Sequence, residues 1–231
     1  GKGTFTMSGG TIKNCKANYC GGAVVAGNIF TMSGGVIENC ESEDFGGAVS
    51  IMSASNGAAT FNLNGGTIKN CKAKHGGAVA NGNGSKYISH FNMTSGTIDN
   101  CEAELSGGGV NNEIRGISTM DGGTIKNCKA YCGGGVYVVC EGKYDKSAHQ
   151  FIPTNGTDNE LSKFNMNGGT IENCKSVDTI YGKDNQLLLG RGGGICVLYG
   201  TFTMTDGTIK NCSSIDGKGD AVWLYANADM I

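Results

Sequence analysis

Cysteine is the residue type in this sequence that is best able to do chemistry, because a thiolate can bind metal, form a disulfide or attack a substrate. Eleven of the 231 residues are Cys. Seven of them each follow an asparagine in a recurring motif: Cys15, Cys40, Cys71, Cys101, Cys128, Cys174 and Cys212. One cysteine per repeat forms a column and not a set of ligands that converge on one point. We therefore expect mostly free, buried thiols that act as small apolar side chains, and neither a metal nor a cofactor.

The four other cysteines are Cys20, Cys132, Cys140 and Cys196. Cys20 and Cys132 belong to distant repeats, whereas Cys140 and Cys196 belong to neighbouring ones. Because a disulfide needs its two α-carbons within about 7 Å, Cys140 and Cys196 form the one pair that we would test for a bond.

Histidines that could act as general acids or bases are few and scattered. His75, His90 and His149 fall in unrelated turns and loops and have no repeated acidic partner. The sequence contains no G-x-S-x-G, H-E-x-x-H or P-loop motif. We interpret all three as surface histidines.

Clustered carboxylates would offer another route to chemistry, the cleavage of a polysaccharide. Asp121 and Asp206 lie in or beside the same turn of two repeats, and Asn167 takes that place in the repeat between them. Asp and Asn also favour turns, because their short side chains bond to nearby backbone. We favour the turn-forming interpretation, and we assign no catalytic residue.

These residues belong to a repeat that covers almost the whole chain. Its motif is F-x-M-x-G-G-T-I-x-N-C-x-A, followed after a short gap by G-G-A-V. Its most regular column is isoleucine: Ile12, Ile37, Ile68, Ile98, Ile125, Ile171 and Ile209. Apolar and polar residues alternate within each row, which predicts strands with one inward face. Glycines break each row between the strands.

One row of about three short strands cannot bury its apolar face alone, so the rows must stack. Parallel stacking of like rows predicts an all-β fold, a single-stranded, right-handed parallel β-helix of about seven coils with three short strands each. We expect a single β-helix domain over residues 1–231, with loop insertions at 139–163 and 177–191. Since the chain begins at Gly1 and not at Met, we expect a fragment of a longer chain.

The residue after each isoleucine alternates in charge along the chain. The column reads Lys13, Glu38, Lys69, Asp99, Lys126, Glu172 and Lys210. Like charges in register destabilise a sheet, and alternation removes that repulsion. The asparagine before each cysteine predicts a left-handed bend, with an asparagine ladder in which each amide donates to the next coil.

The overall composition excludes two classes of partner. Lys and Arg number 18 and Asp and Glu number 20, so the net charge of -2 gives no strong field to attract nucleic acid. No run of eighteen apolar residues occurs, so we expect no membrane insertion.

The two insertions are where we expect binding, because function in a solenoid usually lies in loops or along one face. Our weak candidates in or beside them are Tyr144, Phe151, Tyr181, Leu188 and Arg191. Exposed strand edges at the two ends of the stack also predict end-to-end self-association, unless they are capped.

The pattern "NCKA…GGAV" resembles the repeats in the passenger domains of chlamydial polymorphic outer-membrane proteins, and those of many β-helical surface proteins of gut bacteria. All seven rows take part. The resemblance implies a pectate-lyase-like right-handed β-helix displayed outside a bacterial cell, typically in adhesion. The outer-membrane proteins have Phe three residues before the Asn, where this chain has Thr, and no catalytic residue carries over.

Together, these observations predict a non-enzymatic, adhesin-like module that is secreted or held on a bacterial cell surface. Its rigid scaffold would present loops to a host glycan or protein. The alternative is a fragment of a carbohydrate-active β-helix enzyme, either a polysaccharide lyase or a hydrolase.

Overall fold

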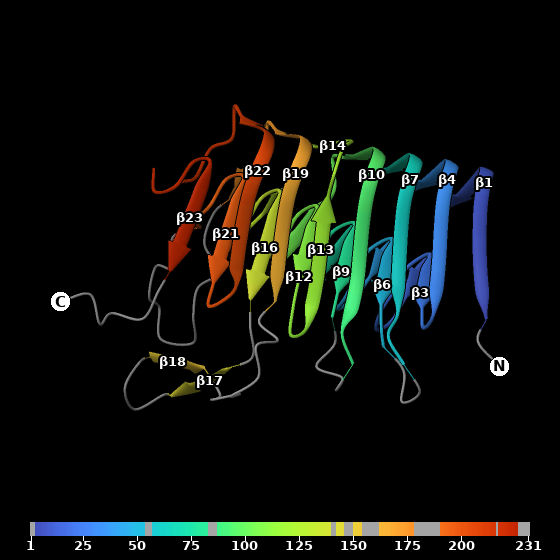
Figure 1. Cartoon of the computed structure of the whole chain (residues 1–231), viewed down its shortest axis with the longest axis horizontal. Coiled ribbons are helices and arrows are strands. Elements are labelled where there is room, and N and C mark those ends of the chain that lie inside the picture. Colours follow the sequence, from blue (N-terminus) through green and yellow to red (C-terminus); the bar gives the residue numbers. More distant parts are fainter. Residues whose placement is uncertain are drawn as a thin grey trace.

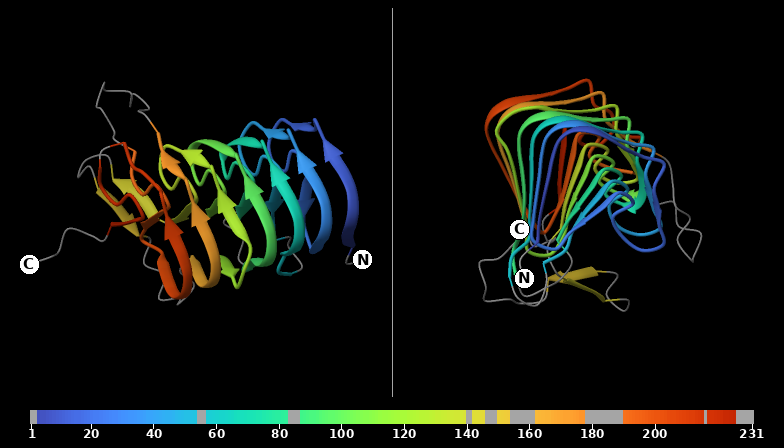
Figure 2. Two further views of the ribbon diagram at one scale, coloured as in Figure 1. Left: turned by 90° about the horizontal axis from the view of Figure 1, so that it is seen from above. Right: turned by 90° about the vertical axis from the view of Figure 1, so that its right-hand side faces the viewer.

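Successive repeats stack as parallel strands, so that the backbone coils along one axis (Figure 1). The computed structural model describes residues 3–53, 57–82, 87–139, 142–145, 150–153, 162–177, 190–215 and 217–225. The strands of the coils form three parallel sheets, A, B and C, and the view along the axis shows the coils lying over one another (Figure 2). This is the all-β parallel β-helix that the repeat predicts. No helix among the described residues is long and apolar enough to cross a membrane.

Each coil contributes to the sheets in the same order. Sheet A contains β1 (Thr4–Lys13), β4 (Ile29–Glu38), β7 (Thr60–Lys69), β10 (Ser89–Asp99), β13 (Gly116–Met120), β14 (Thr124–Lys126), β19 (Lys163–Glu172) and β22 (Thr201–Lys210). Sheet B contains β2 (Lys16–Ala17), β5 (Glu41–Ser42), β8 (Lys72–His75), β11 (Glu102–Ser106), β15 (Lys129–Ala130) and β20 (Lys175–Ser176). Sheet C contains β3 (Val24–Ala26), β6 (Val49–Ile51), β9 (Val79–Asn81), β12 (Val110–Asn112), β16 (Val136–Val139), β21 (Ile195–Leu198) and β23 (Val222–Tyr225). A separate antiparallel pair, β17 (Gly142–Asp145) and β18 (Gln150–Pro153), falls within the first insertion.

The strands of sheet A are longer than the sequence predicts. We expected glycines to end a short strand, but β1 and β4 run through their glycine pairs and have ten residues each. A register shift on either side of Ser8 marks a bulge, which absorbs the glycines without ending the pairing. Gly35 needs to be glycine here, because its φ is +87° and a Cβ would lie 2.7 Å from the carbonyl oxygen of Gly10.

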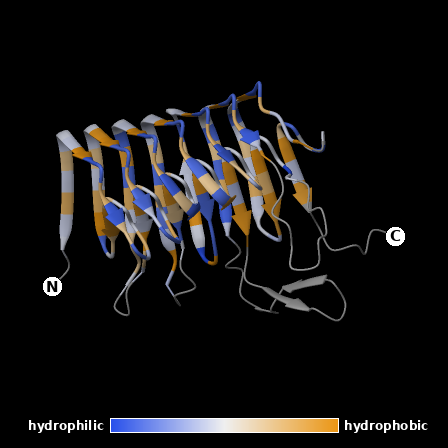
Figure 3. Cartoon of the chain, turned by 180° about the vertical axis from the view of Figure 1, so that it is seen from behind, coloured by the Kyte–Doolittle hydropathy of each residue, from blue (hydrophilic) through white to orange (hydrophobic). Residues whose placement is uncertain are grey.

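The core is built from columns of identical side chains. Phe30, Phe61 and Phe91 are buried, and their rings stack with centroids 4.6 and 5.3 Å apart. The isoleucines pair in register along sheet A, as Ile12 does with Ile37 and Ile37 with Ile68. Colouring by hydropathy shows the alternation of apolar and polar residues along the strands (Figure 3). Burial of these columns supplies the main favourable free energy of folding.

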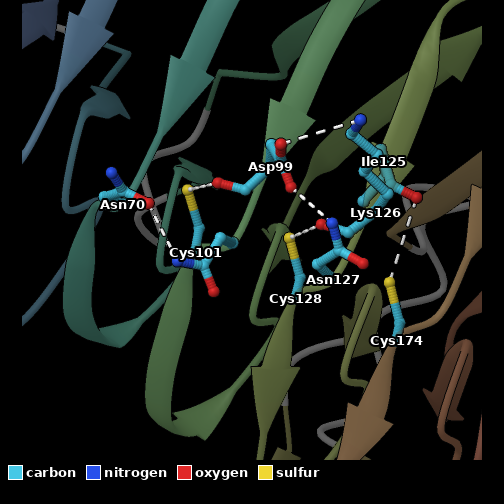
Figure 4. A network of polar contacts seen from close by, with 9 residues as sticks. Asn70, Asp99, Cys101, Ile125, Lys126, Asn127, Cys128 and Cys174 are labelled. Atoms are coloured by element: carbon cyan, nitrogen blue, oxygen red, sulfur yellow. Dashed lines mark hydrogen bonds and ion pairs between the residues drawn. The ribbon is translucent and has the colours of Figure 1, made fainter.

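All seven repeat asparagines adopt the left-handed conformation, which confirms the predicted bend. Their φ angles lie between 50° and 58° at Asn14, Asn39, Asn70, Asn100, Asn127, Asn173 and Asn211. The predicted ladder of amides is wrong except at one step, where Asn100 Nδ2 donates to Asn70 Oδ1 at 2.8 Å. One step further, Asn127 donates to Asp99 Oδ1 at 2.7 Å (Figure 4). Among the described residues the column therefore acts chiefly through backbone conformation.

The repeat cysteines are free thiols, as predicted, and five of the seven are buried. Each thiol donates to the carbonyl oxygen two residues before it, as Cys101 does to Asp99 at 3.4 Å and Cys128 to Lys126 at 3.2 Å (Figure 4). The backbone between donor and acceptor contains the left-handed asparagine. The thiol is thus both an apolar filler and a weak hydrogen-bond donor that closes the bend.

The alternating charges face one another between coils, as predicted. Beside sheet A, Lys69 Nζ lies 3.0 Å from Glu38 Oε2, and Lys210 Nζ lies 3.1 Å from Glu172 Oε2. Each such pair is partly exposed and contributes little alone, about 0.2–1 kcal/mol. A shift of register between two coils would move the lysine away from the acid that faces it, so the column favours a single register.

The apolar columns are interrupted by one buried polar cluster. Ser118 stands where neighbouring coils have Phe91 and Phe164, and it is buried beside Asn81 and Asn112. Asn81 Nδ2 donates to Asn112 Oδ1 (2.8 Å) and to Ser118 Oγ (3.0 Å), and Ser118 Oγ donates to Asn112 Oδ1 (2.8 Å). The amide of Asn112 also donates to the carbonyl oxygen of Gly116. Such a cluster is stable only while its members pair with one another.

Candidate functional site

The bend between sheets B and C lines up the residues that precede each glycine pair. These residues, which we call the pre-glycine column, are Cys20, Phe45, His75, Ser106, Cys132 and Arg191, and neighbours pair in register. The bend requires glycine, because Gly76 has a φ of +69° and a Cβ there would lie 2.4 Å from the carbonyl oxygen of Val79. The repeated tight bend therefore fixes the position of the column.

Four polar residues of adjacent coils form a connected cluster at this bend. The bend cluster consists of His75, Ser106, Asn111 and Glu113. His75 Nδ1 lies 2.7 Å from Ser106 Oγ, which donates its proton to Asn111 Oδ1 at 3.3 Å. Asn111 Nδ2 in turn donates to Glu113 Oε1 at 2.9 Å. The direction of the contact between His75 Nδ1 and Ser106 Oγ depends on the tautomer of the imidazole, because the hydroxyl can both donate and accept.

Burial shifts the pKa of both titratable members of the cluster. Ser106 and Asn111 are buried, while the side chains of His75 and Glu113 keep 23% and 20% of their exposure. Burial lowers the pKa of His75, against a smaller opposite effect of the charge of Asp44. Burial also raises the pKa of Glu113, and the hydrogen bond from Asn111 opposes that rise. The cluster therefore favours a neutral imidazole near pH 7.

The geometry does not match a nucleophile that is activated by histidine. In a Ser-His-acid triad the serine and the acid bind opposite nitrogens of the imidazole ring. Here both partners lie at Nδ1, with Ser106 Oγ at 2.7 Å and Glu113 Oε1 at 3.9 Å. Ser106 also donates its hydroxyl proton to Asn111 and is itself buried. This arrangement can orient and bind groups, but it does not prepare a serine for attack.

An aromatic stack extends the column toward the N-terminal coils. The ring of Phe45 is stacked on the imidazole of His75, with centroids 5.2 Å apart and planes inclined by 19°. Tyr19 meets Phe45 edge to face at 6.0 Å and is 58% exposed. The result is a surface of aromatic rings that begins in solvent and ends at the bend cluster.

A cationic and aromatic contact occupies the opposite end of the column. The guanidinium of Arg191 lies 4.7 Å from the centre of the Trp223 ring, in the range of a cation–π interaction. Trp223 pairs in register with Cys196 on sheet C. Cys196 is a free, buried thiol, and a hydrogen bond with Cys132, together with burial, raises its pKa well above the usual value. The neighbour of Cys196 in the fold is thus Cys132, while its predicted partner, Cys140, lies outside the described residues.

Of the five predicted binding residues, Arg191 is the one whose side chain is described, and it belongs to the pre-glycine column. Tyr144 and Phe151 pair with each other in the β17–β18 ladder, where the backbone alone is described. Tyr181 and Leu188 lie outside the described residues. The structure therefore places Arg191 beside Trp223.

The acids beside the first turn have structural partners. Asn167 Nδ2 donates to Asp121 Oδ1 at 2.9 Å, and Asp206 Oδ1 accepts from the backbone nitrogen of Gly207 at 2.7 Å. All three side chains are exposed. These contacts agree with the turn-forming interpretation of the three residues.

Sequence reasoning missed most of the bend cluster and interpreted His75 as an unrelated surface residue, which is wrong. Alignment on the Asn-Cys motif hides the pre-glycine column because the spacing varies. Gly76 follows Cys71 by five residues, whereas Gly107 follows Cys101 by six. Alignment on the glycine pairs would have found it.

No group of three or more His, Cys, Asp or Glu side chains within the described ranges could hold a metal ion. Comparisons of the chain with models of protein families, with curated proteins and with solved structures gave no match.

Proposed function

We propose that this chain is a non-enzymatic recognition module, adhesin-like, which binds glycan on the outside of a bacterial cell. The binding surface is the aromatic end of the pre-glycine column, formed by Tyr19, Phe45 and His75. The bend cluster behind it supplies polar groups.

The aromatic stack is the observation that carries this proposal. Sugar rings present C–H groups on their faces and hydroxyls at their edges, so they pack on aromatic faces and need polar partners beside them. Tyr19 and Phe45 supply such faces, and neutral His75 supplies a ring nitrogen that accepts a hydrogen bond. A surface that is more than half solvent-exposed at Tyr19 is accessible to a polymer.

Backbone pairing holds these rings in place before any ligand arrives. Phe45 N donates to Tyr19 O at 3.0 Å, and Gly46 N donates to His75 O at 2.9 Å. Because the scaffold is already ordered, binding loses little conformational entropy. This favours recognition by a preformed surface.

The extracellular, bacterial setting of the proposal rests on the resemblance of the repeats to surface-displayed β-helices. The alternative, a carbohydrate-active enzyme fragment, needs carboxylates that are directed at a substrate. Asp121 and Asp206 bind the side chain of Asn167 and the backbone of Gly207 instead. We therefore favour a binding module over an enzyme as the function of this chain.

A glycan array probed with the full chain, followed by calorimetry on the best ligand, tests the proposal. We expect Tyr19→Ala and Phe45→Ala each to weaken binding by about tenfold, which corresponds to one lost stacking contact. Ile215→Ala is the matched control, because it removes another exposed apolar side chain from a distant coil. Release of new reducing ends from a bound polysaccharide would refute the non-enzymatic reading, and binding of host protein but no glycan would refute the ligand class.

A further inference from the structure

The second charged column, on sheet B, alternates in sign except at one step. Lys16 pairs in register with Glu41, Glu41 with Lys72, Lys72 with Glu102 and Glu102 with Lys129. The next pair is Lys129 with Lys175. Beyond it, Lys175 meets Ser213. Two lysines thus lie side by side, an arrangement that the rest of the column avoids.

Carboxylates neutralise these two lysines only in part. Glu102 Oε2 lies 3.4 Å from Lys72 Nζ and 3.2 Å from Lys129 Nζ, so one acid serves two cations. Within the described part of the chain, Lys175 makes no ion pair. The four side chains Lys72, Glu102, Lys129 and Lys175 therefore carry two net positive charges, from three lysines and one glutamate.

A cavity of about 450 Å³ lies at this step of the column. It is lined by Asn127, Cys128, Lys129, Asn173, Lys175 and Asn211. Two of the lining residues, Asn127 and Cys128, are drawn in Figure 4. All of the lining residues except Cys128 are exposed, so solutes can reach the cavity, and none of them is acidic.

Two carboxamides in the lining are available as donors. Asn127 already donates to Asp99, but no side-chain hydrogen bond joins Asn173 or Asn211 to another described residue. An amide N–H and an ammonium are the donors that sulfate, phosphate and carboxylate oxygens prefer. Repeat geometry holds these asparagines at successive levels, about 4.8 Å apart.

We infer that this cavity binds an oxyanion, and specifically a sulfate ester of an acidic polysaccharide. An anion between Lys129 and Lys175 takes the position of the acid that the alternation lacks, and it removes the repulsion between them. The volume exceeds that of a single anion, so it also admits part of the sugar that bears the ester. This site lies on sheet B at a step distant from the aromatic surface, and it does not depend on the proposed function.

Calorimetry with dextran sulfate, and with uncharged dextran as the reference polymer, tests the inference at low ionic strength. We expect dextran sulfate alone to bind, and Lys175→Glu to weaken that binding by at least about tenfold. Lys74→Glu makes the same change of charge at an exposed lysine that does not line the cavity, and we expect it to change the affinity less than about twofold. Equal losses of affinity in the two variants would mean that net charge alone attracts the polymer, and this result would overturn the proposed site. The absence of any binding of dextran sulfate to the wild type would overturn it as well.

Inorganic sulfate, compared with chloride at equal ionic strength, separates the two sources of the anion. If sulfate protects the fold against heat in the wild type and not in Lys175→Glu, the cavity recognises the anion itself. If dextran sulfate binds but inorganic sulfate does not, and Lys175→Glu abolishes the binding of dextran sulfate, the cavity recognises the sugar together with its sulfate ester. Lys175→Glu restores the alternation, so we expect it to fold and to melt higher than the wild type without ligand, which keeps a loss of binding distinct from a loss of fold.

Discussion

Lys69 Nζ lies 3.0 Å from Glu38 Oε2, and the two residues occupy the same position in successive coils. The contact joins residues that are remote in sequence but adjacent along the axis. It shows how a repeat of nearly identical rows avoids placing like charges in register.

Reversal of one charge should therefore weaken the stack. Lys69→Glu places three acidic side chains in succession, between Glu38 and Asp99. We expect the free energy of unfolding to fall by about 1 kcal/mol in low salt, and by less at high ionic strength, where exposed charges are screened. Urea denaturation at two salt concentrations measures both effects. Lys69→Gln, the neutral control, should lose less, and a loss that does not change with salt would contradict the electrostatic cause.

Substitutions at two asparagines should separate backbone conformation from hydrogen bonding. Asn39 has a φ of 54° and makes no side-chain hydrogen bond among the described residues, whereas Asn100 donates to Asn70. Asn39→Ala should lower the free energy of unfolding by about 1–2 kcal/mol. Asn39→Gly should leave it almost unchanged, because glycine tolerates this conformation.

Asn100→Gly should cost more than Asn39→Gly, by about 0.5–1.5 kcal/mol for the lost bond. Thermal denaturation of the three variants gives these differences. Equal costs for the two glycine variants would show that the bond contributes nothing.

The buried cluster of Asn81, Asn112 and Ser118 should be sensitive to partial removal and tolerant of full replacement. Asn112→Ala removes the oxygen that accepts from Asn81 and Ser118 and the amide that donates to the carbonyl oxygen of Gly116, so we expect the free energy of unfolding to fall by about 2–4 kcal/mol. The triple change Asn81→Ile, Asn112→Val and Ser118→Phe installs the residues of neighbouring coils and should recover most of it. Chemical denaturation measures the comparison, and a triple variant that is less stable than Asn112→Ala would refute it.

The bend cluster should make stability depend on pH. Burial lowers the pKa of His75 in the folded chain below its ordinary value of 6.5, so the unfolded chain takes up its proton first. The contribution of His75 is therefore full above about pH 6.5 and is lost as the pH falls toward the lowered folded value. Glu113, with a raised pKa, acts in the opposite direction.

Unfolding of the wild type and of His75→Gln between pH 8 and pH 5 isolates the histidine, because Glu113 is common to both. The wild type should lose stability relative to the variant as the pH falls. Parallel curves would exclude the predicted shift.

The buried thiols should be unreactive while the chain is folded. Burial raises the pKa of Cys101 and Cys128 well above 9, which suppresses the thiolate that attacks a disulfide reagent. We expect these two to remain unlabelled by a thiol reagent at pH 8 and all 11 cysteines to react in denaturant without reductant. Nine reactive thiols would instead indicate a disulfide, and mapping would show whether Cys140 and Cys196 form it.

The fold could be read from the sequence because its columns repeat one residue type. Isoleucine, asparagine and cysteine recur at fixed offsets, and each identity has one physical cause, either burial or a left-handed bend. The length of the sheet A strands could not be read in this way. Glycine pairs signal turns by local propensity, but the neighbouring coils pair with both sides of Gly10 and hold it within a strand.

The bend cluster escaped for the opposite reason. The pre-glycine column changes its residue in almost every coil, from Phe45 to His75 to Ser106, so periodicity carries no signal. Its contacts also join residues whose distance from each other depends on how sharply the backbone bends, as between Ser106 and Asn111. A repeating pattern of residue types can predict the scaffold. A site that is formed by residues that depart from the pattern can be found only in the three-dimensional structure.

The alternating column beside sheet A has an odd number of members. Its seven members begin with Lys13 and finish with Lys210, so the first and last levels present the same sign. Each of the five inner members faces an opposite charge in the coil before it and in the coil after it, so the reversal of one sign disturbs two contacts between coils and not one. The middle levels of the column are therefore the ones most sensitive to substitution.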